Sequence, residues 1–129
     1  MGKVSTGTST ATPITTAYSF YENIDSTDSQ GYVISSTTTD DGGRAYTAAL
    51  NLLSNADEYD INLLLLPGIF DSISGHQGII TKAIDVCESR GDCFLIYDNQ
   101  EYSETNISNV TSKAAERDSN YAATYWPWV

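Results

Sequence analysis

Hydrophobic residues recur every three or four positions in three stretches after residue 43, which is the spacing of one face of an α-helix. The stretches are residues 44–54, 74–91 and 103–118. Their apolar positions are Tyr46, Ala49, Leu50 and Leu53; Ile80, Ala83, Ile84 and Cys87; and Ile107, Val110 and Ala114. Ser74 and Gln77 have the spacing of a capping box, and Gly91 is suited to end the second stretch. The pattern therefore predicts three amphipathic helices.

Three shorter apolar stretches alternate with these helices, at residues 59–68, 93–98 and 121–128. In the first, the run Leu63–Leu66 is unbroken and Pro67 and Gly68 follow it, which is typical of a strand that is buried on both faces and ends there. The second has the same character and ends at Asp98. The pattern predicts three strands, each buried on both faces.

The order of these elements predicts an α/β fold. Strand and helix alternate through residues 44–129, and two successive βαβ units form a small parallel or mixed sheet flanked by helices. We therefore assign residues 44–129 to one domain.

Residues 1–43 have a different composition, rich in Ser and Thr, and are assigned to a separate N-terminal segment. Residues 17–21 and 31–35 contain aromatic and β-branched residues of the kind found in short strands. Consecutive aspartates and glycines at residues 40–43 indicate a turn or linker before the domain. We expect this segment to be partly extended or disordered.

Composition and charge exclude several classes of protein. The 129 residues suit a single domain, and no apolar run approaches the ~18 residues of a membrane helix. Seventeen acidic against six basic residues give a net charge of −11, which repels nucleic acid and anionic membranes. The first residues contain no apolar block of the length that a secretory signal needs, so synthesis in the cytoplasm is predicted.

The two cysteines, Cys87 and Cys93, fit a cytoplasmic protein as reduced thiols, and a disulfide between them is the less favoured alternative. Together with the single histidine, His76, they do not make the four-ligand pattern of a zinc site. Neither a metal nor another cofactor is predicted.

Catalytic residues in an open parallel sheet would lie in the loops after the strands. The loop after the first strand contains Asp71, Ser72, Ser74 and His76, which are too close in sequence to form a triad without a dedicated turn. The G-x-S-x-G pattern is also missing. His76 is therefore interpreted as a surface or packing residue.

Asp98 directly follows the second strand, where a phosphoacceptor aspartate could lie. Such an acceptor needs further carboxylates for magnesium and a nearby lysine. Lys82 and Lys113 fall within predicted helices, so Asp98 is interpreted as a loop or turn residue. The sequence predicts no catalytic residue.

The last predicted strand is rich in aromatic residues. Pro127 removes a backbone donor and limits further pairing. The aromatic side chains either fill the core on both faces of the sheet or pack against sequence or subunits outside this chain. These side chains are Tyr121, Tyr125, Trp126 and Trp128.

Three segments, in this order and at these intervals, resemble the contractile tail sheath proteins of myophages: "NADEYDINLLLLPGI", "CESRGDCFLIYD" and "SNYAATYWPWV". The resemblance covers about residues 42–129. It implies a virion structural protein without enzymatic activity. Sheath subunits form stacked helical rings around the tail tube, and the sheath contracts during DNA delivery into the host cell.

Sheath proteins are several times longer than this chain and continue past the aromatic strand. The resemblance therefore implies a fragment of a subunit, made in the host bacterial cytoplasm and monomeric by itself. Its partners in the full-length form would be other sheath subunits and the tail tube protein. The structural and contact candidates are Pro67, Gly68, Asp98, Tyr121, Tyr125, Trp126, Pro127 and Trp128.

Two alternatives stay open. The same core would suit a sheath subunit of a related contractile injection system. A different class, a small α/β enzyme or phosphoacceptor domain, would use Asp98 and the loop from Asp71 to His76.

Overall fold

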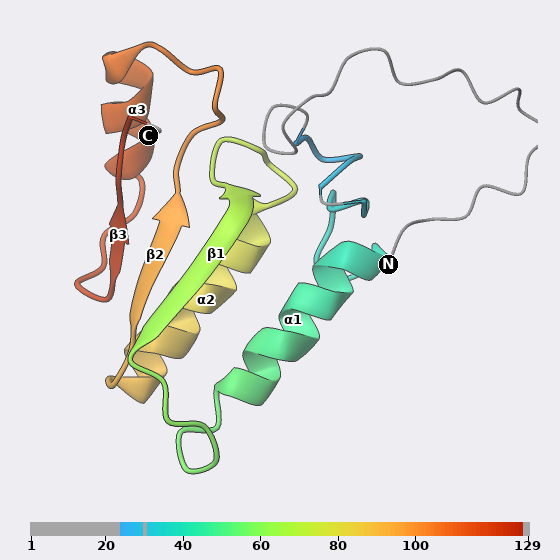
Figure 1. The fold of residues 1–129 in the computed structure, drawn as a ribbon, viewed down its shortest axis with the longest axis vertical. Helices are drawn as coiled ribbons and strands as arrows, with labels where there is room; N and C mark the ends of the chain where they lie inside the picture. The colour runs from blue at the N-terminus through green and yellow to red at the C-terminus, as the bar shows by residue number, and fades with distance from the viewer. Residues whose placement is uncertain (1–23, 30, 128–129) are drawn as a thin grey trace, which may run out of the picture.

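The computed structural model describes residues 24–29 and 31–127 (Figure 1). The elements in chain order are α1 (Asp41–Leu53), β1 (Leu63–Phe70), α2 (Gln77–Arg90), β2 (Phe94–Asp98), α3 (Ile107–Ala114) and β3 (Ala122–Thr124). The strands form one parallel sheet in the order β1-β2-β3, and a helix connects each strand to the next. The predicted α/β class is confirmed, and the sheet is parallel throughout.

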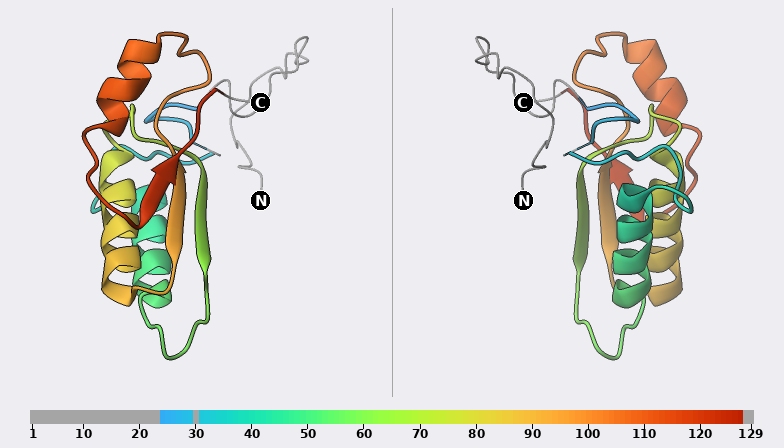
Figure 2. Two further views of the ribbon diagram at one scale, coloured as in Figure 1. Left: turned by 90° about the vertical axis from the view of Figure 1, so that its left-hand side faces the viewer. Right: turned by 90° about the vertical axis from the view of Figure 1, so that its right-hand side faces the viewer.

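The helices lie on one side of the sheet (Figure 2). α2 packs against β1, β2 and α1, and α3 lies beyond the carboxyl ends of the strands on the same side. The main core lies between the helices and the sheet. Its buried residues are Ile34, Leu50, Leu64, Leu66, Ile69, Ile79, Ile80, Ala83, Ile84, Val86, Cys87, Cys93, Leu95 and Tyr97.

The prediction that the strands are buried on both faces is wrong. Leu64 and Leu66 are buried under the helices, whereas Leu63 and Leu65 are more than half exposed. The cause is the strand order: two successive right-handed crossovers that advance in one direction across the sheet place both connecting helices on the same face. Among the described residues, no helix covers the opposite face (Figure 2).

Pro67 and Gly68 lie inside β1 and do not end it, which corrects the second prediction for this strand. The pairing register with β2 shifts between Leu66 and Phe70, so this part of β1 forms a bulge. Gly68 has a φ of 77°, a conformation that a residue without Cβ adopts at little cost. Ile69, within the bulge, and Phe70, where pairing with β2 resumes, are both buried.

The C-terminal end of α2 was predicted correctly and its N-terminal cap was not. Gly91 adopts the left-handed conformation with φ 72°, and its N–H donates to the Cys87 carbonyl. At the other end, His76 is the N-cap residue and its side chain makes no capping hydrogen bond. The side chain of Gln77 instead donates to the Asp71 carbonyl at 3.0 Å, so the predicted capping box does not form.

The turn predicted at residues 40–43 is part of a helix, because α1 begins at Asp41. Its two glycines allow close contact with residues 32–37: a Cβ on Gly43 would lie 2.1 Å from the carbonyl oxygen of Ser36. This contact brings Ile34 into the main core. Residues 31–35 form no strand beyond an isolated bridge at Tyr32, and residues 17–21 lie outside the described residues.

The last strand and last helix are shorter than predicted. β3 covers only Ala122–Thr124, and Tyr125 and Trp126 follow it outside the strand. α3 begins at Ile107 because the side chain of Asn106 caps it, accepting a hydrogen bond from the Ser108 N–H. Of its predicted apolar positions, Val110 is buried and Ile107 is exposed.

Candidate functional site

The carboxyl ends of the strands, where ligands bind in open parallel sheets, carry most of the candidate side chains. The loop after β1 contains Asp71 and His76, Asp98 ends β2, and Trp126 follows β3. Five features of the structure can be assessed as sites. They are an ion pair, a buried histidine, the surroundings of Asp98, an aromatic hollow and the uncovered face of the sheet.

Asp71 and Arg117 form a bidentate ion pair. Arg117 Nη2 lies 2.5 Å from Asp71 Oδ1, and Arg117 Nε lies 3.1 Å from Asp71 Oδ2. Arg117 Nη1 also donates to the Thr81 hydroxyl at 2.7 Å. The Asp71 side chain is fully buried, and its hydrogen bonds with Arg117 raise the pKa of the guanidinium. The pair joins the loop after β1 to α2 and to the segment after α3, which is a structural role.

His76 is fully buried. Its Nδ1 accepts a hydrogen bond from the Phe70 N–H at 3.1 Å, and the two rings stack with centroids 6.5 Å apart. Burial lowers the pKa of His76, and the nearby Asp25 carboxylate opposes that effect. Within the described part of the chain, His76 Nε2 and Ser72 Oγ have no hydrogen-bond partner. The neutral, enclosed ring suits packing and gives a substrate no access.

Asp98 lies beside the bulge of β1. Its carboxylate receives a hydrogen bond from the Gly68 backbone, and partial burial raises its pKa. The Asp98 carbonyl accepts from the Asp71 N–H at 3.0 Å. The structure thus brings together two residues, Gly68 and Asp98, that are thirty positions apart in the sequence. Residues 24–29 and 31–127 contain no group of three or more His, Cys, Asp or Glu side chains that could hold a metal ion.

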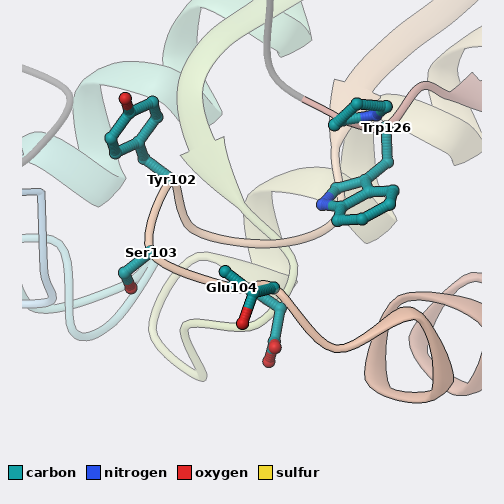
Figure 3. Close-up of a pocket in the computed structure, with 6 residues that line it drawn as sticks. Tyr102, Ser103, Glu104 and Trp126 are labelled. Carbon is teal, nitrogen blue, oxygen red and sulfur yellow. The ribbon is translucent and has the colours of Figure 1, made fainter.

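An open hollow of about 460 Å³ lies between the loop after β2 and the residues after β3. Tyr102 and Trp126 stand on two sides of it, and Glu104 lies on the same loop as Tyr102 (Figure 3). Ser103, Thr105 and Pro127 complete its lining. The Glu104 carboxylate accepts from the Asn109 side chain and the Asn106 N–H, which lowers its pKa. Its oxygens are therefore already engaged within the loop.

The aromatic candidates have different environments. Tyr121 is partly buried against the main core, Trp126 lines the hollow, and Tyr125 is 71% exposed. Trp128 lies outside the described residues.

The side of the sheet that faces away from the helices is apolar, exposed along β1 and partly exposed along β2 and β3. Strand alternation and the pairing register place five residues on it, which we call the open face: Leu63, Leu65, Phe94, Ile96 and Ala123. Leu63 and Leu65 are 51% and 55% exposed. None of the five carries a charge, and Asp98, the next position in the same alternation, lies at the carboxyl end of β2 at the edge of this face. The open face is suited to packing against another apolar surface.

Several of these features were not predicted. The open face follows from right-handed crossovers only once the strand order β1-β2-β3 is known, and the sequence does not give that order. Arg117 and the residues Tyr102–Thr105 belong to no motif, and their positions depend on how the loops return to the sheet edge.

Comparison of the chain with protein-family models, with curated proteins and with solved structures finds no match. The resemblance to tail sheath proteins therefore stays a prediction. None of the helices in the described part of the chain has the length and apolar character that crossing a membrane requires.

Proposed function

We propose that the chain is part of a structural subunit of a phage contractile tail sheath. In this role it polymerises with other sheath subunits around the tail tube and belongs to the virion. The observation that carries the proposal is the open face: an apolar sheet surface whose leucines are more than half exposed. The resemblance of residues 55–69, 87–98 and 119–129 to sheath proteins supports it from the sequence.

Surfaces of this kind favour association. Contiguous exposed apolar patches usually mark sites of contact, and the cores of protein interfaces are depleted of charge. The open face has this composition, so a neighbouring subunit can cover it without bringing like charges together. The acidic remainder of the surface would pair with basic surfaces on other subunits.

A contracting lattice also needs subunits that keep their shape while their contacts change. Both ends of α2 are tied to the rest of the domain. At its C-terminal end, Arg90 donates to the carbonyls of Leu53 and Tyr59 at 2.6 and 2.7 Å. Near its N-terminal end, Thr81 accepts from Arg117. These ties would let the domain move as one body between two lattices.

The proposal assigns no catalytic residue to the chain. The side chains of Asp71, His76 and Glu104 form internal hydrogen bonds that hold loops in place. A sheath subunit of a related contractile injection system would use the same open face in the same way.

The experiment is negative-stain electron microscopy of the gene product, including any sequence that flanks these 129 residues, expressed alone and concentrated. Tubes or stacked rings support the proposal, and uniform small particles at every salt concentration contradict it. Leu65→Lys should prevent assembly. Leu52→Lys is the matched control, because Leu52 is 54% exposed on α1, away from the sheet. If Leu65→Lys assembles like the parent protein, the open face is not the assembly surface.

The phosphoacceptor alternative depends on Asp98, which is half-buried with a raised pKa at the end of the central strand. Calorimetric titration with Mg²⁺ tests it. Binding that Asp98→Asn abolishes would favour the alternative, and no heat of binding would leave the structural proposal standing.

A further inference from the structure

The two cysteines lie side by side in the main core, at the turn between α2 and β2. Cys87 is in the last turn of α2, and Cys93 immediately precedes β2. Gly91, in the left-handed conformation, reverses the chain between them. As a result, the two Sγ atoms are 3.2 Å apart, with Cys87 fully buried and Cys93 4% exposed.

Arg90 and Asp92 hold this turn in one conformation. The Arg90 guanidinium makes two hydrogen bonds to the Asp92 carboxylate, at 2.8 and 2.9 Å. Two further N–H groups reach carbonyls at the end of α1 and in the α1–β1 connection, and the Arg90 side chain is 1% exposed. Because the turn is anchored on both sides of Gly91, the thiols stay paired in the folded protein.

We propose that Cys87 and Cys93 are a dithiol site that forms an intramolecular disulfide when the folded protein meets a small-molecule disulfide such as oxidised glutathione. A disulfide has an S–S length of about 2.05 Å, so the two sulfurs must approach by only about 1 Å. The bond would join the end of α2 directly to the start of β2.

The reaction proceeds by two thiol–disulfide exchanges. Cys93, the more exposed cysteine, attacks the disulfide of oxidised glutathione as the thiolate and forms a mixed disulfide, and one glutathione thiolate leaves. Cys87, as the thiolate, then attacks Cys93 Sγ and displaces the second glutathione. The two protein thiols lose two protons and two electrons in total, and one oxidised glutathione becomes two reduced molecules.

Burial determines the rate of this reaction. Removal from water, with the neighbouring Cys93 thiol as a further cause, raises the pKa of Cys87 to about 12. Because the thiolate is the reacting form, oxidation is slow at neutral pH and faster at higher pH. The same burial protects the finished disulfide from reductants. In a virion protein the bond would form after the particle leaves a reducing cytoplasm, a consequence that depends on the proposed function.

The test uses the whole protein, fully reduced and then incubated folded with excess oxidised glutathione at mildly alkaline pH. The product is quenched in acid, its free thiols are alkylated, and it is digested with trypsin without reductant. Cleavage after Lys82, Arg90 and Lys113 places the cysteines on separate peptides, residues 83–90 and 91–113. We expect the two peptides to be linked, with a mass two hydrogen atoms below their sum.

Thermal unfolding supplies an independent readout. Because the disulfide constrains the unfolded chain, the oxidised protein should melt about 5 °C or more above the reduced protein. Cys87→Ala and Cys93→Ala each keep one thiol and should show no such rise on oxidation. The peptide map needs only the parent protein, so it decides the question even if neither variant folds.

Two results would overturn the proposal. The first is recovery of both cysteines as alkylated free thiols after oxidation of the folded protein. The second is glutathione retained on either cysteine as the final product. None of these readouts depends on tube formation, so they distinguish failure of this proposal from failure of the proposed function.

Discussion

Four consecutive leucines in β1 occupy two different environments. Leu64 and Leu66 point toward the helices and are 9% and 5% exposed, whereas Leu63 and Leu65 point to the open face and are more than half exposed. The residue type is the same, so the difference comes from the single layer of helices. The covered face stabilises the domain, and the open face keeps apolar surface that the domain itself does not use.

The buried and the exposed leucines also differ in how much they stabilise the domain. Fully burying a leucine side chain contributes about 1.5–3 kcal/mol relative to leaving it exposed. Leu64 and Leu66 make that contribution within the domain. Leu63 and Leu65 can make it only when another surface covers them, which is why the open face supports an assembly role.

The largest predicted effect on the free energy of unfolding concerns the ion pair at the carboxyl ends of the strands. Arg117→Ala leaves the fully buried Asp71 carboxylate without its ion-pair partner, and we expect a loss of about 3–5 kcal/mol in the free energy of unfolding. Arg44→Ala is the control, because the Arg44–Asp41 pair is exposed and 4.0 Å apart. Urea unfolding measures both. Equal, small losses would show that the buried pair is not a structural tie.

The leucines provide the most direct test of the comparison. Leu66→Ala should cost about 3 kcal/mol because it leaves a cavity under α2. Leu65→Ala should cost less than about 1 kcal/mol because the side chain is already solvated. Urea unfolding of the isolated chain measures both losses. Similar values for the two variants would contradict the division of the sheet into covered and open faces.

Gly68 marks the point where alternation between the faces stops. Gly68→Val should cost about 2 kcal/mol, because a β-branched residue is strained at a φ of 77°. Gly68→Ala should cost less and separates the backbone strain from the effect of branching. Thermal unfolding is the measurement, and an unchanged melting temperature for Gly68→Val would rule out this strain.

Trp126 tests whether the aromatic residues after β3 belong to the core. Because its ring lines an open hollow, Trp126→Ala should cost about 1 kcal/mol, below the 3 kcal/mol or so expected for a tryptophan in the core. Tyr102→Ala, on the other side of the hollow, should have a similarly small effect. A loss near 3 kcal/mol in urea unfolding would place the ring in the core instead.

The smallest predicted effect is a pH dependence of the free energy of unfolding that comes from His76. The pKa of His76 is lowered from 6.5 in the folded protein, so the unfolded chain binds a proton first as the pH falls. This residue's contribution to stability is therefore complete above pH 6.5 and decreases as the pH falls through that value toward the lower folded pKa. His76→Asn keeps an acceptor for the Phe70 N–H and should lose this dependence. Urea midpoints at several pH values between 7.5 and 5.5 measure it, and parallel curves would refute it.

Much of the fold was predictable because the spacing of hydrophobic residues and the order of the elements can be read from short stretches of sequence. The apolar stripe of Ile80, Ala83, Ile84 and Cys87 indicated α2, and Gly91 indicated its end. The alternation of strands with helices then led to a parallel sheet. The site was less predictable, since Asp71 and Arg117 are 46 residues apart and no local pattern links them.

The incorrect predictions have a shared physical cause. A run of leucines indicates a strand, but which side chains are buried depends on where the helices cross. Pro67 and Gly68 resemble a stop in the sequence, yet β2 supplies pairing partners on both sides of them. Gly42 and Gly43 resemble a turn, yet they allow residues 32–37 to contact α1 closely.

The sequence by itself determined the types and order of the elements, because hydrophobic spacing and glycine at a helix end act over a few residues. Only the tertiary structure decided which face of the sheet is covered, which charges are paired and which thiols meet. Those outcomes depend on the hand and direction of the crossovers and on how the loops return to the sheet. They bring together side chains that the sequence keeps apart, and they expose two leucines beside two that are buried.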